Sequence, residues 1–170
     1  MTAVFAVLSA MSLVVLDAGM LNVALPVLSE RLAVAPSQAI LAVTAYQAGL
    51  VMALLPAGAL GERFGLRRIF VLGVSLFALA SLACAAAPGL GWLVAARLIQ
   101  GLGGAALMVV PRAIIRDLYT GPAATRLMAA VMMVISVSPM LAPLAGAGLM
   151  AVAGWRAIFG ALVVAAAISL

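Results

Sequence analysis

The sequence predicts an all-α protein, a polytopic bundle of transmembrane helices. Composition, the length of the apolar runs and the placement of basic residues all point to this class. Of the 170 residues, 68% are hydrophobic and 8% are charged, and the mean hydropathy is +1.38. A soluble domain is about half apolar and a quarter charged. The composition therefore excludes a soluble globule, a disordered chain and a disulfide-rich secreted domain, and Cys84, the single cysteine, has no partner for an internal disulfide.

Six apolar runs separated by short polar or Pro/Gly-marked gaps are the candidate membrane spans. A helix crosses the hydrocarbon layer, ~30 Å thick, with about 20 residues, and backbone in lipid must satisfy its own hydrogen bonds. We expect helices over about 4–27, 39–60, 69–87, 92–110, 127–151 and 156–170. The last run would be only roughly 22 Å long. We therefore expect residues 1–170 to be the N-terminal transmembrane part of a longer protein, ending inside its sixth helix.

All nine basic residues are arginines, and their placement predicts the orientation in the membrane. Two joints between spans, the second and the fourth, hold six of them: Arg63, Arg67, Arg68, Arg112, Arg116 and Arg126. The opposite side holds Arg31 and Arg156. Because cytoplasmic loops carry the excess of positive charge, we expect a multi-pass protein of the cell membrane with a cytoplasmic N-terminus. Nucleic acid is not an expected partner, since a binding site for it would cluster the charge on one face.

Two ionisable side chains, Asp17 and Arg97, lie well inside the spans. Each costs about 2.5–3.5 kcal/mol near the middle of the membrane, so such groups face a cavity or a partner. Counted along their helices, both lie roughly 20 Å from the inner boundary, which predicts a pair at matched depth. The pair is either a proton-titratable site in an aqueous cavity or a static link between two helices.

Other polar or adaptable side chains inside the spans are candidates for a substrate cavity. Gln100 lies one helical turn from Arg97 and shares its face. Hydrogen bonding between helices or contact with lipid explains such residues as well. The candidate cavity residues are Asn22, Tyr46, Gln47, Gln100 and Met140.

The fifth span combines glycines, which permit close helix approach, with prolines, which remove a backbone donor. Pro139, Pro143 and Gly146 make this span a candidate moving part, although ordinary helix contact explains the glycine equally well.

The sequence contains no histidine and no familiar enzyme motif. The GLGG segment at 101–104 lies inside a span and does not follow a strand, so it does not indicate a nucleotide site. We expect a protein that is not an enzyme and that needs no metal or organic cofactor.

Four segments together resemble the major facilitator superfamily, and within it the drug:proton antiporters. GALGERFGLRRIF (58–70) is similar to the signature between the second and third helices of that family, with Glu62 where Asp is usual and Leu66 where a basic residue is common. LVAARLIQGLGGA (93–105) resembles the fourth-helix signature, SPMLAPLAGAG (138–148) the fifth-helix antiporter signature, and LDAGMLNVALP (16–26) the first-helix signature of multidrug exporters.

Two shorter segments add to this resemblance. GWRAIF (154–159) is similar to the start of the sixth helix in the family, and RAIIRDLYTG (112–121) resembles the bicyclomycin-resistance-type branch, whereas the opening of the chain is closer to the fourteen-helix branch.

The resemblance implies an N-terminal six-helix half built of 3+3 inverted repeats, facing a C-terminal half of the same protein. It implies alternating access, with proton-coupled efflux of small hydrophobic or cationic compounds driven by the proton gradient, so the partners would be the lipid bilayer, protons, a small-molecule substrate and that second half. Asp17 and Arg97 would couple protons to transport. A cytoplasmic gating loop would act as a latch through Gly58, Glu62, Arg63, Gly65 and Arg67.

Two alternatives remain open. One is a non-transporting membrane-embedded fragment that binds a partner or regulates a carrier. The other is a nutrient importer of the same superfamily.

Overall fold

The computed structural model describes residues 2–169, and the side chains of residues 5–169. Within that part the chain forms six helices and no strand, which confirms the all-α prediction. The helices are α1 (Thr2–Arg31), α2 (Pro36–Phe64), α3 (Leu66–Ala85), α4 (Leu90–Leu118), α5 (Gly121–Ala153) and α6 (Arg156–Ser169). The first five are long and apolar enough to cross a membrane, and α6 is shorter. Residue 170, the end of the last predicted span, lies outside the described residues.

The helices extend beyond the predicted spans at two joints. The segment expected to be a gating loop is a tight helix–turn–helix, because α2 continues to Phe64 and α3 begins at Leu66. Gly65 alone makes this turn with φ +98°, a conformation that glycine adopts without the steric penalty of a side chain. The joint at 111–126 is also mostly helical, since α4 continues through Pro111 to Leu118. Hydropathy marks where the apolar layer ends, whereas the backbone hydrogen bonds continue into the polar region.

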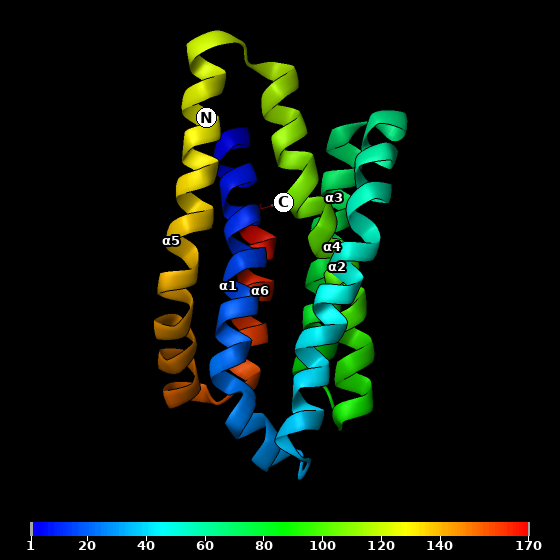
Figure 1. Ribbon diagram of the computed structural model, residues 1–170, viewed down its shortest axis with the longest axis vertical. Helices are drawn as coiled ribbons and strands as arrows, with labels where there is room; N and C mark the ends of the chain where they lie inside the picture. Colours follow the sequence, from blue (N-terminus) through cyan, green and yellow to red (C-terminus); the bar gives the residue numbers. More distant parts are fainter. Residues whose placement is uncertain (1, 170) are drawn as a thin grey trace.

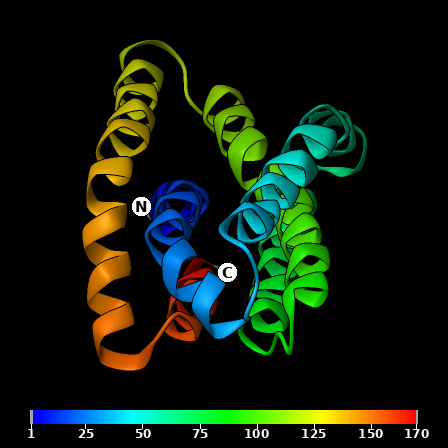
Figure 2. The same cartoon turned by 60° about the horizontal axis from the view of Figure 1, so that its bottom comes forward.

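The six helices form two groups of three (Figure 1). In one group α4 packs against α2 and α3, and in the other α1 packs against α5 and α6. Contacts between α3 and α6, and between α1 and the helices α2 and α4, join the groups. Figure 2 shows the same division from nearer the end where α1 joins α2. Exchanging α1 with α4, α2 with α5 and α3 with α6 reproduces this contact pattern, as expected for 3+3 inverted repeats.

Glycines of α4 allow its backbone to approach two neighbours closely. A Cβ on Gly101 would collide with the backbone of Tyr46 and come within 2.8 Å of the Leu50 nitrogen in α2. A Cβ on Gly103 would lie 2.7 Å from the Phe77 nitrogen in α3. The GLGG segment of α4 therefore allows close packing between helices. This packing places α2 and α3 beside the part of α4 that carries Arg97.

The antiporter-like segment of α5 contacts α1 through its small side chains. Ser138, Ala142 and Gly146 are buried at intervals of four residues, and a Cβ on Gly146 would lie 3.0 Å from the Met20 Cα in α1. Pro139 and Pro143 lie on the exposed side of this continuous helix. The prolines therefore do not contribute to the α1–α5 contact.

The arginines other than Arg97 lie towards the ends of the bundle, as the sequence predicts. The α2–α3 and α4–α5 joints lie at one end, where α1 also begins, and the α1–α2, α3–α4 and α5–α6 joints lie at the other (Figure 1). At the latter end Arg156 donates from Nε to the Ala85 carbonyl (2.9 Å) and from Nη2 to the Ala87 carbonyl (3.0 Å). It thereby satisfies the carbonyl of the last residue of α3, which helix geometry leaves unpaired, and a carbonyl just beyond the helix.

The two tryptophans, Trp92 near the start of α4 and Trp155 just before α6, differ in exposure. Trp92 is 57% exposed, and its Nε1 donates to the Ala83 carbonyl at 2.9 Å. Trp155 is 4% exposed and packs edge-on against Phe159, with the ring centroids 6.1 Å apart. The Trp155 ring therefore lies inside the bundle, whereas the Trp92 ring is exposed on its surface.

Candidate functional site

Asp17 of α1 and Arg97 of α4 form a salt bridge where the two groups of helices meet. Arg97 Nη1 lies 2.7 Å from both Asp17 Oδ1 and Oδ2, and neither side chain has any exposed area. It is the one salt bridge in the part of the chain whose side chains are described. The contact confirms the prediction that the two charges lie at matched depth.

The remaining contacts of Arg97 come mainly from α2. Its Nε donates to the Ala42 carbonyl (3.3 Å), and its guanidinium carbon lies 4.2 Å from the centroid of the Tyr46 ring. The Phe159 ring of α6 is 5.8 Å away. An aromatic face attracts a cation most strongly where water is excluded. These contacts hold Arg97 against α2 and α4, so Asp17 is the side chain that ties it to α1.

Gln100 extends the polar contacts to α3. Its Oε1 accepts from Arg97 Nη1 (2.7 Å), and its Nε2 donates to Ser81 Oγ (2.8 Å). Ser81 in turn donates to the Phe77 carbonyl (2.7 Å), and Cys84 Sγ lies 3.7 Å from Gln100 Oε1. Gln100 is therefore part of the charged site, as its one-turn spacing from Arg97 predicts.

The polar cluster is closed to solvent in this conformation. Asp17, Ser81, Arg97 and Gln100 are all 0% exposed, and Tyr46 is 2% exposed. Two clefts lie elsewhere: one, of about 420 Å³, is bordered by Pro26 of α1 and Pro36 of α2, and the other lies at the opposite end of the bundle. The two charges meet in direct contact and do not line an open aqueous cavity here. A solvent path to Asp17 therefore requires the helices to move.

The structure separates the predicted cavity residues into two sets. Tyr46 and Gln100 contact Arg97, as described above. Asn22, Gln47 and Met140 are exposed on the outer surfaces of α1, α2 and α5, and Met140 is 75% exposed. The structure does not bring these three residues together with the salt bridge, so a cavity formed with them stays a prediction.

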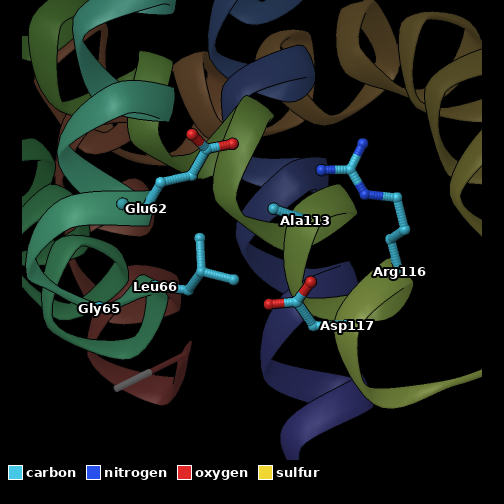
Figure 3. Close-up of a pocket in the computed structure, with 7 residues that line it drawn as sticks. Glu62, Gly65, Leu66, Ala113, Arg116 and Asp117 are labelled. Carbon is cyan, nitrogen blue, oxygen red and sulfur yellow. The ribbon is translucent and has the colours of Figure 1, made fainter.

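The predicted latch borders the cleft at the other end of the bundle, which has a volume of about 310 Å³. Figure 3 shows Glu62 of α2 and Asp117 of α4 on opposite sides of this cleft, with Leu66 of α3 between them in the view. Arg63 lies outside the cleft, with its guanidinium carbon 5.3 Å from the centroid of the Phe64 ring. The latch role stays a prediction.

Sequence reasoning missed the contribution of α3 to the site. Ser81 and Cys84 lie one helical turn apart on a buried face of α3, and both contact Gln100. Two polar side chains at this spacing near the end of an apolar span mark one face of α3, although they do not show what that face contacts. The contact of Arg97 with the Ala42 carbonyl could not be predicted from the sequence, because every residue of a helix has a backbone carbonyl.

The helical architecture agrees with a comparison against known families. A family model described as the Major Facilitator Superfamily matches residues 7–170. The chain belongs to the Major Facilitator Superfamily. Membership in this family of transporters explains the inverted contact pattern, and the four segments that resemble its signatures all lie inside the matched region.

Individual relatives within the superfamily are similar to most of this chain. The uncharacterized transporter YebQ of Escherichia coli K12 is 39% identical over 157 residues, which cover 92% of this chain and 34% of YebQ. The multidrug resistance protein Stp of Mycobacterium tuberculosis is 35% identical, over 86% of this chain and 28% of Stp. The methylenomycin A resistance protein of Bacillus subtilis is 34% identical, over 85% of this chain and 31% of that protein. The chain spans about a third of the length of these relatives.

Proposed function

We propose that the protein to which this chain contributes is a proton-coupled exporter of small hydrophobic or cationic compounds. It would act in the cell membrane, with the N-terminus in the cytoplasm and the proton gradient as its energy source. The drug-resistance names of Stp and the methylenomycin A resistance protein support the substrate class. The arginine-rich joints at one end of the bundle support the orientation.

The observation that carries the proposal is the Asp17–Arg97 pair, buried without exposed area at membrane depth. Removing two charges from water is unfavourable, and their mutual attraction compensates for it only with good geometry and further hydrogen bonds. A purely structural link between two helices is achieved at least as well by apolar side chains. A buried ion pair in a transporter therefore favours a role in which one of the two charges is neutralised during transport.

The proposed switch is the protonation of Asp17. A proton that enters from outside would form an O–H bond on the carboxylate and remove the negative charge that faces Arg97. Arg97 would keep its contacts with Gln100, the Ala42 carbonyl and the Tyr46 ring, so it would stay with α2 and α4. The link to α1 would weaken, and a cationic substrate would compete with the proton for the same carboxylate. This competition is the coupling step.

The other candidate residues would contact substrate, form the latch or move with α5. Asn22, Gln47 and Met140 face outward from α1, α2 and α5, which suits contact with substrate at a second, C-terminal half of the protein. Gly58, Glu62, Arg63, Gly65 and Arg67 would form the cytoplasmic latch between conformations. α5, with Pro139 and Pro143 on its outer side, would move against the same second half.

Replacing Asp17 by Asn in the full-length protein tests the coupling. Inverted membrane vesicles are given a proton gradient, and uptake of ethidium, a lipophilic cation, is followed by fluorescence. We expect Asp17→Asn to abolish gradient-driven uptake, because the Asn side chain neither titrates nor carries a negative charge. Uptake that persists with Asp17→Asn would refute the coupling role.

Glu30→Gln is the matched control, since Glu30 lies on the same helix and is exposed. This variant should transport like the native protein. Ethidium that binds but never accumulates in the native vesicles would instead indicate a non-transporting binding protein.

A further inference from the structure

A hydrogen-bond chain without exposed area runs from the backbone of α3 to the salt bridge. Its links are the Phe77 carbonyl, Ser81 Oγ, the Gln100 amide, Arg97 Nη1 and the Asp17 carboxylate. Each donor–acceptor distance is 2.7 or 2.8 Å. In a site without water each of these polar groups depends on its protein partner, because an unpaired one is costly.

The Ser81 hydroxyl sets the direction of the donors and acceptors in this series of hydrogen bonds. A serine hydroxyl carries one hydrogen, and Ser81 donates it to the Phe77 carbonyl. Towards Gln100 its oxygen therefore acts as an acceptor, which orients the amide so that Nε2 faces α3 and Oε1 faces Arg97. With the amide reversed, its NH₂ group would meet the guanidinium, and two donors would face each other.

The orientation of Gln100 matters because one nitrogen of Arg97 makes all of these contacts. Nη1 carries two hydrogens and meets three acceptors, namely Gln100 Oε1 and the two Asp17 oxygens. Nη2 has no hydrogen-bond partner among the residues whose side chains are described. By accepting a hydrogen bond from Nη1, Gln100 Oε1 therefore holds in place the Arg97 nitrogen that contacts the Asp17 carboxylate.

We infer that Ser81 and Gln100 are positioning residues that set the pH at which Asp17 takes up its proton. The inference rests on the proposed function, because it assumes that Asp17 is the proton carrier. Loss of the Ser81 hydroxyl leaves the Gln100 amide free to turn, and Arg97 is then held less firmly against Asp17. The carboxylate is stabilised less, so it binds its proton at a higher pH.

Few other groups near the pair can titrate. α2 contributes Tyr46, α3 contributes Cys84, and α4 contributes Arg97 itself. From α6 the Phe159 ring faces Arg97, and it does not titrate. The basic residues of α5 and α6, Arg126 and Arg156, lie at the ends of the bundle. If a Ser81 variant changes the pH at which binding is half-maximal, the change therefore reports on the Asp17–Arg97 pair.

The test measures binding of tetraphenylphosphonium to the purified full-length protein as a function of pH. Ser81→Thr and Ser81→Val have nearly the same shape and differ in the hydroxyl. We expect the Ser81→Thr midpoint to match the native one, and the Ser81→Val midpoint to lie higher by about one pH unit, the equivalent of one lost hydrogen bond. A merely structural role would lower the amount of folded protein or the affinity at every pH, without moving the midpoint.

Further variants separate the possible failures. Ser75→Val changes a half-buried serine on the same helix outside this hydrogen-bond chain, and it should leave the midpoint in place. Ser81→Ala, which adds no volume, replaces Ser81→Val if that variant does not accumulate. Equal midpoints for the variants with and without the hydroxyl overturn the inference, provided that Asp17→Asn abolishes the pH dependence. An unchanged pH dependence in Asp17→Asn overturns the proposed function itself.

Discussion

Arg97 depends on an aromatic ring as well as on its charged partner. Its guanidinium carbon lies 4.2 Å from the Tyr46 ring centroid, and both side chains are buried. Tyr46 also donates from its hydroxyl to the Val14 carbonyl of α1, at a long 3.4 Å. The ring and the hydroxyl thus connect α2 to different neighbours, and substitution can separate their contributions.

We expect Tyr46→Leu to destabilise the protein by roughly 2 kcal/mol, because it removes a cation–π contact from a water-free site. Tyr46→Phe keeps the ring and loses the long hydrogen bond, so its effect should stay below about 1 kcal/mol. Thermal unfolding of both purified variants in detergent measures the difference. Equal losses would mean that the hydrogen bond from the Tyr46 hydroxyl to Val14, and not the contact of the ring with Arg97, accounts for the stability.

Side-chain chemistry alone predicts the charged residues of the site but not its full extent. Asp17 and Arg97 stand out because ionised groups are rare inside apolar spans, and Gln100 follows from its spacing. Ser81 is as polar as many serines that bond only to their own helix, and it does donate to the Phe77 carbonyl. Its acceptance of a second bond from Gln100 depends on how closely α3 approaches α4, which the order of residues in α3 does not reveal.

The close contact of α2 with α4 places the Tyr46 ring over Arg97. It depends on glycine at two facing positions, since a Cβ on Gly49 would collide with the Leu98 carbonyl and one on Gly101 with the Tyr46 carbonyl. In membranes such small residues are the main means by which helix backbones come together. The glycine-rich part of α4 therefore acts on the site by controlling the distance between helices.

Gly101→Ala should lower the stability by roughly 1–3 kcal/mol, the usual effect of overfilling a tight contact. Gly91→Ala is the matched control on α4, because a Cβ there meets nothing within 4 Å. The measurement is the unfolding temperature of each purified variant in detergent. If both variants unfold like the native protein, α2 and α4 have room to separate and the contact is not tight.

The two three-helix groups are joined at membrane depth by few polar contacts. The Asp17–Arg97 pair links α1 to α4, and the Tyr46 hydroxyl links α2 to the α1 backbone. At one end of the bundle, Arg156 of α6 donates to the carbonyl of the last residue of α3 and to one just beyond it. Neutralising Asp17 would therefore remove the charged link between the groups while the contact at that end stays in place.

Accessibility labelling tests which end of the molecule faces the cytoplasm. Ser37 lies at the start of α2 and Thr120 lies between α4 and α5, at opposite ends, and both are exposed. In intact cells a membrane-impermeant maleimide should label Ser37→Cys and not Thr120→Cys, because the arginine-rich end is retained inside. The native Cys84 is buried and should stay unlabelled, so it serves as the control. The reverse labelling pattern would invert the proposed orientation.

The sequence by itself determined the helical class, the grouping of arginines by joint and the two charges that had to meet. Each follows from the high energy of polar groups in lipid, which leaves a strong pattern along the chain. Only the tertiary structure decided that the charges meet without exposed area, that α3 supports them through Ser81, and that Asn22, Gln47 and Met140 lie apart from them. These features depend on distances between helix backbones, which are set by many small side chains acting together and by no single motif.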